Sequence, residues 1–356
     1  HSTYERPRPR KKDGSLDHTA GLIDTIDLVA NVEQARQVLK RYKREELLSG
    51  RFWERSDTQK RFKSNTRVER NLLENLRAIR SLLVDGEGLG AQAVHRLLGR
   101  AIFIQYLEDR KDTHGYGAFP EGYFERFLSG ASCFADILSN KKATYGLFEA
   151  LEHKFNGDIF PISRGEKQNV ESDDLAILSQ FLLGKITLPN RQLSFWPYYS
   201  FDAIPIEFIS NMYEEFFHYE EEEREAAESG QAKKVRGGTY YTPQRLVEFV
   251  LDEVLPWEGK NTDIRVLDPA CGSGIFLVEC YRRLVSHWQQ ANPKKKIDTA
   301  SLKKLMVDNL YGVDLNSEAV RVAAFSLYLT MCDYLEPRHI WANLKFPALG
   351  NKNLWN

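Results

Sequence analysis

The sequence predicts an α/β fold with a parallel sheet in its last third, preceded by a mainly α-helical region. Three observations lead to this prediction. A chain of 356 residues is long enough for about two domains. Apolar residues recur at helical spacing from Ile23 to about Arg110. After residue 237, short apolar strands alternate with helices around a Gly-rich turn. We therefore expect a helical region over residues 1–236 and an α/β region over residues 237–356.

The composition excludes several classes of protein. Hydrophobic residues make up 42% of the chain and the mean hydropathy is −0.47, which excludes a fully disordered chain and one built of membrane helices. The four cysteines show no paired spacing, and neither a disulfide framework nor a zinc motif is present in the sequence. No apolar run approaches the length of about 18 residues that a membrane span needs. We expect a cytoplasmic protein without a membrane partner.

The first part of the helical region is predicted from apolar spacing. Apolar residues recur over residues 68–83, and the segment over residues 91–110 is the most apolar of these helices. That second segment contains His95, Arg96, Arg100, Glu108, Asp109 and Arg110. We interpret them as a charged rim on a buried helix instead of a site.

The second part of the helical region ends in a change of composition. Residues 111–210 show mixed helices and loops, and another helix is predicted over residues 204–223. Apolar character is then lost over residues 220–238, which end on the paired glycines 237 and 238, and we place a linker at about residues 219–236. This pattern is typical of a mobile acidic linker and predicts the boundary between the two regions.

The α/β region is predicted element by element from its turns and apolar runs. Thr242 suits the N-cap of a helix and Pro243 suits its first turn. The elements that follow in chain order are a strand over 264–267 ending in Asp268, a DPACGSG turn, a helix over 275–288, a second buried strand over 310–313 ending in Asp314, and a helix over 318–335.

A ligand crevice is expected where the two strands end. Ligands of such sheets bind at the carboxyl ends of the strands, which here brings together Asp268, Ala270, Gly272, Ser273, Gly274 and Asp314. An acid at the head of the turn repels pyrophosphate and suits a cationic ligand. The second acid is placed to accept hydrogen bonds from ribose hydroxyls. S-adenosylmethionine, a positively charged nucleoside, fits both acids.

Three segments resemble successive motifs of a known family. GGTYYTPQRLVEFVLDEVL (237–255), VLDPACGSGIFLVECYRRL (266–284) and LYGVDLNSEAVRVAAFSLYLT (310–330) resemble those of amino-group DNA methyltransferases, specifically the large adenine-N6 enzymes of restriction-modification systems. The three occur in order, and the preceding helical segments show a weaker resemblance. The resemblance implies the N-terminal half of a Rossmann-like methyltransferase domain.

The resemblance also implies which residues meet the cofactor. Tyr241, Thr242 and Pro243 would lie against its methionine end, where helix amides are available for the carboxylate. The alternative for Thr242 is a plain helix cap, and both roles can hold together. The resemblance also places Asp268 near the methionine amino group, with the backbone of Ala270, Gly272 and Gly274 approaching the cofactor and Phe276 shaping the pocket. Asp314 would accept the ribose hydroxyls, and Leu315 and Asn316 would lie beside the adenine. We interpret Cys271 as a small filler instead of a nucleophile.

The chain departs from the family at the catalytic motif. Amino-group methylases contain an (Asp/Asn/Ser)-Pro-Pro-(Tyr/Phe/Trp) tetrapeptide, whose aromatic residue stacks on the extruded base. This sequence has no Pro-Pro pair, and the family's order would place the tetrapeptide after Asn356. We expect a chain truncated before that motif and inactive by itself. The alternative is a non-catalytic module that binds DNA or a subunit and is built on a degenerate methyltransferase half.

The expected partners are double-stranded DNA, a target-recognition domain or subunit, and a nuclease domain or subunit. A nuclease of the PD-(D/E)xK type is not indicated within the chain, because Glu166 and Lys167 lack the upstream acid. Residues 1–80 carry 19 basic and 12 acidic side chains. Eight of these basic residues could contact DNA phosphates or simply face solvent. They are Arg36, Lys40, Arg41, Lys43, Arg44, Lys60, Arg61 and Lys63.

Overall fold

The computed structural model describes residues 2–4, 22–25, 39, 68–112, 114–155, 161–188, 193–194, 196–199, 201, 242 and 244–356. The chain divides into two compact units. The first comprises His1–Leu82 and Gln180–Ala203, and the second comprises Leu83–Ser179 and Ile204–Asn356. The predicted helix over 204–223 and the predicted linker over 219–236 lie outside the described residues, so the boundary at residue 236 stays a prediction.

The first unit contains the helix predicted over residues 68–83. Helix α5 (Val68–Ser81) buries Leu72, Leu76 and Ile79, which lie at the spacing of one helical face. Elsewhere in this unit, the strands β1 (Ser2–Tyr4) and β2 (Leu22–Thr25) form an antiparallel pair. The prediction of helical structure from Ile23 onward is therefore wrong at its start, because pairing between distant segments decides the conformation there.

A second core of the first unit surrounds a tryptophan. Trp196, in the short helix η4 (Trp196–Tyr198), is buried between two phenylalanines. Its ring centroid lies 5.2 Å from that of Phe181 and 4.2 Å from that of Phe201. These aromatic contacts join parts of the chain that helical periodicity alone does not connect.

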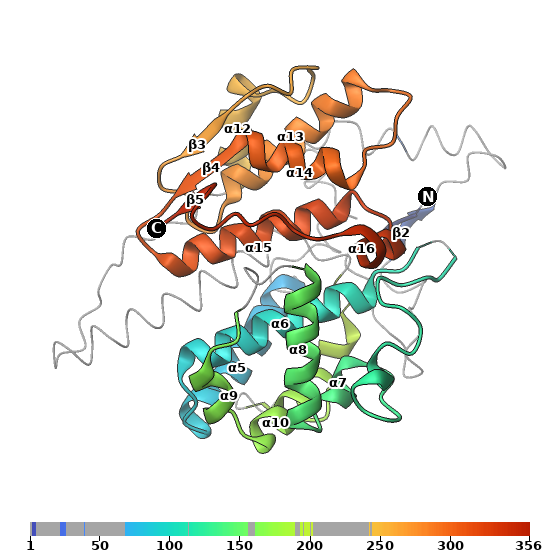
Figure 1. Ribbon diagram of the computed structural model, residues 1–356, viewed down its shortest axis with the longest axis vertical. Coiled ribbons are helices and arrows are strands. Elements are labelled where there is room, and N and C mark those ends of the chain that lie inside the picture. The colour runs from blue at the N-terminus through green and yellow to red at the C-terminus, as the bar shows by residue number, and fades with distance from the viewer. Residues whose placement is uncertain are drawn as a thin grey trace. The chain divides into compact units, whose positions relative to one another are not determined.

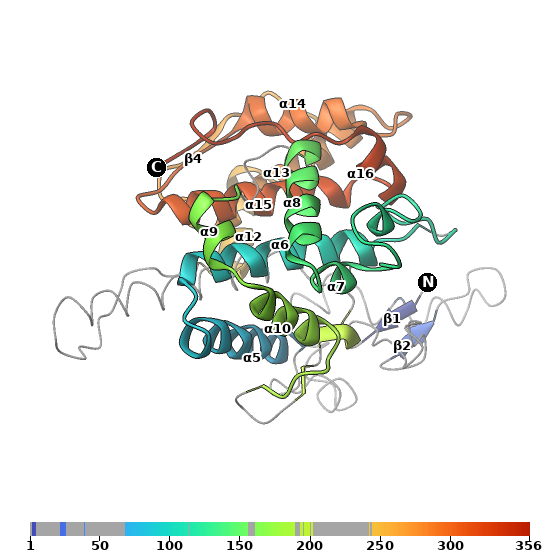
Figure 2. The same ribbon diagram turned by 60° about the horizontal axis from the view of Figure 1, so that its bottom comes forward.

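The second unit begins with a group of helices. The helix predicted over 91–110 is confirmed as α6 (Ala91–Asp109). In Figures 1 and 2, α8 runs across α6. The other helical elements of this group are η2 (Leu82–Gly86), η3 (Phe124–Arg126), α7 (Phe134–Ile137), α8 (Lys141–Phe155), α9 (Arg164–Asn169) and α10 (Ser172–Leu182), of which η2 and α10 extend into the first unit.

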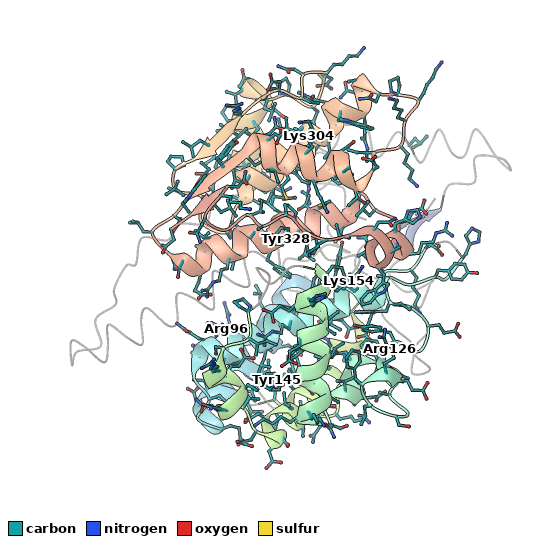
Figure 3. The ribbon with its side chains drawn as sticks, in the orientation of Figure 1. Arg96, Arg126, Tyr145, Lys154, Lys304 and Tyr328 are labelled. Carbon is teal, nitrogen blue, oxygen red and sulfur yellow. The ribbon has the colours of Figure 1, made fainter. Side chains whose placement is uncertain are left out.

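The expected charged rim of α6 is wrong for His95, Arg100 and Asp109, which are buried, whereas Arg96 and Glu108 are half-buried. Arg100 is only 5% exposed and His95 only 4%. The Nη1 atom of Arg100 lies 2.5 Å from Oε1 of the buried Glu166, and the hydroxyl of Tyr145 lies 3.5 Å from the same oxygen. Figure 3 labels Tyr145 among the helices of this group. A buried charge needs a partner, and the ion pair with Glu166 supplies it. Glu166 is therefore occupied in the helical core.

The last third of the chain forms the predicted parallel sheet. Strands β3 (Val266–Asp268), β4 (Leu310–Val313) and β5 (Leu354–Trp355) lie in that order, all parallel (Figure 1). The helices between them are α13 (Ile275–Ala291), α14 (Thr299–Asn309), α15 (Ser317–Asp333) and α16 (Pro337–Asn343). The α/β character predicted for this region is confirmed, and its Rossmann-like classification stays a prediction.

The two faces of this sheet differ in burial. Leu310 and Leu354 are buried on the face where α13 and α15 contact the strands, whereas Leu267 is 63% exposed and Val313 is 37% exposed on the other. The expectation of a fully buried second strand is therefore wrong at Val313. The strand order β3-β4-β5 proceeds in one direction across the sheet. Right-handed connections between strands in such an order place all of the connecting helices on the same face of the sheet.

The helical segment and the last third of the chain share contacts within the second unit. The hydroxyl of Tyr106 donates to Oδ1 of Asp333 at 2.8 Å, and Nη1 of Arg110 donates to the same oxygen at 2.7 Å. Burial raises the pKa of Asp333, and the charge of Arg110 opposes that rise. α6 is thus joined to the end of α15 by a partly buried ion pair.

No helix among the described residues is long and apolar enough to cross a membrane.

Candidate functional site

The Gly-rich turn after β3 is tied to the neighbouring strand. The amide of Cys271 donates to the carbonyl of Val313 at 2.9 Å, which anchors the turn on β4. Gly272 and Gly274 have φ values of +52° and +87°. Such values favour glycine, because other residues lose energy in the left-handed region. The turn then passes into α13, with Gly274 as its N-cap residue.

Packing requires Gly274 to be glycine. A Cβ atom at this position would lie 2.9 Å from Cβ of Ala323 on α15, closer than side chains approach one another. The same holds for Gly312 on β4, where a Cβ would lie 2.9 Å from Cδ1 of Leu277. Sequence reasoning assigned Gly274 to backbone approach toward a ligand. The close contact between α13 and α15 accounts for this glycine without a ligand.

Asp314 connects the two strand ends. Its Oδ2 atom accepts the amide of Gly272 at 2.9 Å, and its Oδ1 atom accepts the amide of Asn316 at 2.8 Å. The first bond spans 42 residues of sequence and the second stays within the local turn. A carboxylate offers about four acceptor positions, so both oxygens retain capacity for ligand hydroxyls. Asp314 therefore fixes the shape of the crevice and can still accept hydrogen bonds.

Asp268 lies beside Asp314 on the adjacent strand end. It pairs in register with Gly312, and Asp314 follows two residues later, so period-2 alternation places both acids on one face. Burial raises the pKa of Asp268; the Ala270 amide, donating at 3.1 Å, lowers it, and the charge of Asp314 raises it further. The structure thus brings the two half-buried acids close together at the ends of β3 and β4, where the crevice is expected.

The other predicted residues occupy different environments around these acids. Asn316 caps α15, with its Oδ1 atom accepting the amides of Glu318 at 2.9 Å and Ala319 at 3.4 Å. Leu315 is 100% exposed. Of the remaining predicted positions, Ser273 is buried, Phe276 and Thr242 are half-buried, Ala270 is exposed, and Tyr241 and Pro243 lie outside the described residues. Helix α12 (Gln244–Val254) begins two residues after Thr242.

The thiol in the turn is not suited to nucleophilic attack. Cys271 is 4% exposed, and burial together with the charges of Asp268 and Asp314 raises its pKa to about 12. The thiolate, which is the nucleophilic form, is therefore disfavoured at neutral pH. This agrees with the interpretation of Cys271 as a small buried filler.

Sequence reasoning missed the contribution of β5 to the crevice. The carbonyl of Trp355 accepts the amide of Asp314 at 3.0 Å. The side-chain amide of Asn356 donates to the carbonyls of Asp314 at 3.2 Å and Leu315 at 2.7 Å. A strand of two residues has no detectable periodicity, so the sequence offered no signal for it. These bonds fix the backbone of the Asp314 turn from its far side.

The arrangement suits a cationic ligand that carries hydroxyl groups. It combines two carboxylates with half-buried turn backbone, and the described residues contain no cluster of His, Cys, Asp and Glu that could hold a metal ion. A carboxylate interacts favourably with an ammonium or sulfonium charge and accepts hydrogen bonds from ribose hydroxyls. S-adenosylmethionine fits this set of donors and acceptors. The eight basic residues considered for DNA contact, at positions 36–63, lie outside the described residues.

Comparison with known proteins points to the same part of the chain. Residues 252–337 match the family model of the MmeI DNA-methyltransferase domain. The chain is 29% identical over 140 residues to the Type I restriction enzyme HindI methylase subunit of Haemophilus influenzae, covering 35% of this chain and 27% of that subunit. It is 35% identical over 89 residues to the adenine-specific methyltransferase PglX of Streptomyces coelicolor, covering 24% of this chain and 7% of PglX.

A solved structure gives a weaker match. The alignment with a modification subunit of a putative type I restriction enzyme from Vibrio vulnificus has a TM-score of 0.23 and 15% identity. It covers 69% of this chain and 54% of that one, and at this TM-score it does not establish a common fold. The chain spans about a quarter or less of the two curated relatives described above. The predicted resemblance to adenine-specific methyltransferases of restriction-modification systems is confirmed, and the matching residues 252–337 include both crevice acids.

Proposed function

We propose that this chain is the helical region and cofactor-binding half of an S-adenosylmethionine-dependent adenine-N6 DNA methyltransferase of a restriction-modification system. One observation supports this above all others. The carboxylate of Asp314 joins the Gly-rich turn to the start of α15, and it lies beside a second acid, Asp268, at the end of the neighbouring strand β3. The named relatives, a methylase subunit and an adenine-specific methyltransferase, support the reaction class.

Each end of the cofactor has an assigned set of residues in this proposal. Asp268 holds the methionine amino group, and its ionised form is the one that binds a cation. Asp314 accepts the ribose hydroxyls, with Leu315 and Asn316 beside the adenine. Thr242, together with the adjoining residues 241 and 243, meets the methionine end. When bound, the cofactor supplies the methyl group, and these side chains orient it and keep it at one end of the sheet.

The chain alone does not methylate in this proposal. The base-binding tetrapeptide of the family is absent from the sequence, so the target adenine has no place to stack. The complete gene product acts on double-stranded DNA together with a target-recognition domain or subunit and a nuclease partner. All four cysteines are free thiols, which suits the reducing cytoplasm where this DNA is found.

The test is a methylation assay on the complete gene product that contains this chain. Unmethylated DNA is incubated with the protein and isotopically labelled S-adenosylmethionine, and the digested nucleosides are identified by mass spectrometry. We expect labelled N6-methyldeoxyadenosine. The variant Asp308→Ala, which changes an exposed acid on α14 outside the crevice, is the matched control and should retain the activity.

Each alternative result has a defined meaning. Labelled N4-methylcytosine would overturn the choice of base and leave the cofactor assignment in place. DNA binding without methylation or cofactor binding would instead support a non-catalytic module built on a degenerate methyltransferase half. Calorimetry with S-adenosylmethionine separates this result from an enzyme that binds its cofactor but lacks the correct DNA target.

A further inference from the structure

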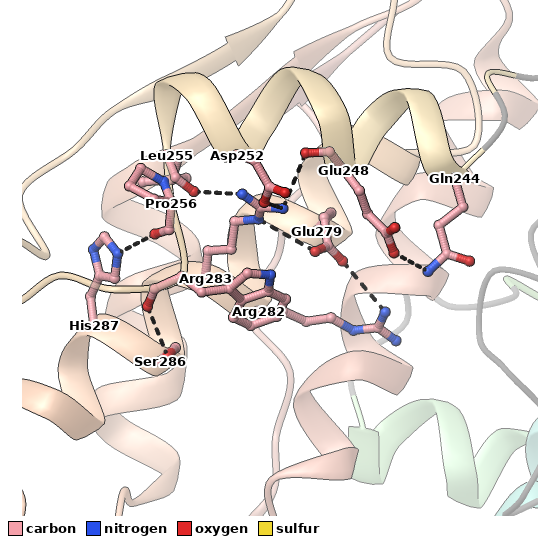
Figure 4. A network of polar contacts seen from close by, with 11 residues as sticks. Gln244, Glu248, Asp252, Leu255, Pro256, Glu279, Arg282, Arg283, Ser286 and His287 are labelled. Atoms are coloured by element: carbon pink, nitrogen blue, oxygen red, sulfur yellow. Dashed lines mark hydrogen bonds and ion pairs between the residues drawn. The ribbon is translucent and has the colours of Figure 1, made fainter. Parts of the chain in front are cut away.

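Arg283 is a fully buried arginine in the middle of α13, outside the crevice. Its side chain is 0% exposed. Its Nη1 atom donates to the carbonyl of Leu255 at 2.8 Å, and its Nη2 atom lies 2.9 Å from Oδ1 of Asp252 (Figure 4). The guanidinium also lies over the ring of Trp257, 5.2 Å from its centroid. Arginine rarely enters a core without a specific set of acceptors, so this position requires an explanation.

The acceptors of Arg283 lie on two helices. Asp252 belongs to α12 and Leu255 directly follows it, while Glu279 lies one turn earlier on α13 itself, with Oε1 at 3.4 Å from Nε. A fourth contact reaches the carbonyl of Glu248 at 3.5 Å. The planar guanidinium therefore holds the last two turns of α12 against the middle of α13. A lysine could not reach these acceptors together, because its three N–H donors all sit on one nitrogen atom, whereas those of a guanidinium are spread over three.

The contacts also determine the relative direction of the two helices. Arg283 meets Glu248 and Leu255, and four residues later the ring nitrogens of His287 lie 2.7 Å from the carbonyl of Pro256 and 2.8 Å from that of Asn261. Increasing residue number on α13 thus meets increasing residue number on the α12 segment. The helices run in the same direction, as Figure 4 shows. Their N-termini consequently lie at the same end of the unit.

That shared end is the crevice end. α13 begins directly after the Gly-rich turn, and α12 begins two residues after Thr242. Helix N-termini present free amides and a partial positive charge, which favour a carboxylate. A change in the register of α12 along α13 would move Thr242 and the first amides of α12 relative to the turn. The clamp at Arg283 prevents such a change.

We propose that Arg283 is a positioning residue that fixes α12 along α13 so that the start of α12 meets the methionine end of the cofactor. This inference rests on the proposed function. Arg283 does not touch the ligand in this account. Replacing Arg283 should weaken the binding of ligands that contain the amino-acid part of the cofactor. It should leave the binding of ligands that consist of the nucleoside alone unchanged.

The matched control lies next to it in the sequence. Arg282 also pairs with Glu279, at 3.7 Å, but its side chain is 21% exposed and that ion pair stays within α13. Burial raises the pKa of Glu279, and both arginines oppose that rise. Arg282→Met therefore removes a similar charge beside the same acid and leaves in place the contacts of Arg283 with α12.

The experiment compares two ligands on the complete gene product. Dissociation constants for S-adenosylhomocysteine and for adenosine are measured by calorimetry for the wild type, Arg283→Met and Arg282→Met. For Arg283→Met we expect roughly tenfold weaker binding of S-adenosylhomocysteine and less than about a twofold change for adenosine. Arg282→Met should leave both constants within about twofold of the wild type. Equal weakening of both ligands by Arg283→Met, or no change in either, would overturn the positioning role.

Two further variants keep the test decisive. If Arg283→Met does not fold, Asp252→Asn removes the charge of one partner, which is 47% exposed, and should weaken S-adenosylhomocysteine selectively by about threefold. Unchanged binding in that variant would then overturn the proposal. Asp314→Ala should weaken both ligands, since both contain the ribose. A wild type that binds neither ligand would refute the proposed function itself, a result distinct from a failure of Arg283 alone.

Discussion

The ends of β3 and β4 lie side by side and each provides an aspartate, yet the two carboxylates are held differently. Asp314 accepts one amide from its own turn and one from the Gly-rich turn 42 residues earlier in the chain. Asp268 accepts the amide of Ala270, two residues away, at 3.1 Å. The first carboxylate therefore links two segments of the fold, while the second is fixed within a single turn.

This difference separates two tasks that a cofactor site requires. A carboxylate with two backbone partners keeps its position before the ligand arrives, so less ordering is needed on binding. A carboxylate whose pKa is raised by burial and by a neighbouring acid gains more from an incoming cation. We infer that Asp314 at the end of β4 fixes the shape of the proposed cofactor site, and that Asp268 at the end of β3 recognises the positive charge of the ligand.

The largest effect is expected from Asp314→Ala. This change leaves the amides of Gly272 and Asn316 without their acceptor and removes the proposed ribose partner. We expect a loss of roughly 1 to 3 kcal/mol in the free energy of cofactor binding, and a loss of similar size in the free energy of unfolding. Calorimetry and thermal unfolding measure the two quantities.

The control for this prediction is an acid of the same region outside the crevice. Asp308 pairs with Lys304 on the exposed surface of α14, and Figure 3 labels that lysine. Asp308→Ala should leave cofactor binding unchanged. If Asp314→Ala lowered stability but not affinity, Asp314 would be a purely structural link and the ribose assignment would be wrong.

A smaller and pH-dependent effect is expected from Asp268→Asn. Because the pKa of Asp268 is raised in the folded protein, its carboxylate takes up a proton at higher pH than an ordinary aspartate. Binding of S-adenosylhomocysteine by the wild type should therefore weaken as the pH falls from about 7 to about 4. Asp268→Asn should bind S-adenosylhomocysteine roughly tenfold more weakly at neutral pH, and its affinity should no longer fall over this pH range.

The same shift predicts the sign of the effect on stability. An acid whose pKa is raised by folding stabilises the folded state at low pH, and that contribution is lost as the pH rises through the folded pKa. The free energy of unfolding of Asp268→Asn should therefore depend less on pH in that window than that of the wild type. Parallel pH profiles of wild type and variant, in both binding and stability, would show that Asp268 is not the titrating group.

The placement of the two aspartates at neighbouring strand ends could be predicted from the sequence because its signals are local. Asp268 and Asp314 each follow a short apolar strand, and the Gly-rich turn stands between the first strand and its helix. Parallel strands bring such positions to one edge without further information. The helix over 318–335 was likewise predicted to within two residues of α15 (Ser317–Asp333).

Features that depend on distant contacts could not be predicted in this way. Gly274 was assigned to ligand approach, which stays a prediction, and the structure adds a second reason for this glycine in its contact with Ala323, about fifty residues later in the chain. Arg100 was expected at the surface and is buried, because Glu166 on another helix provides its partner. Arg283 gave no signal, since its acceptors are mainly backbone carbonyls and side chains of α12. Each case depends on tertiary pairing that no periodicity within one segment can reveal.

The smallest expected effect separates helix capping from recognition at the end of β4. Asn316 caps α15 through the amides of Glu318 and Ala319, and Asp298 caps α14 through the amide of Ser301 at 2.7 Å. Asn316→Ala and Asp298→Ala should each lower the free energy of unfolding by about 1 kcal/mol. Only Asn316→Ala should also weaken S-adenosylhomocysteine, by about two- to fivefold, because the turn held by Asp314 continues directly into this cap. Equal affinities of the two variants for S-adenosylhomocysteine would show that Asn316 only caps α15. Asp314 alone would then fix the shape of the turn after β4.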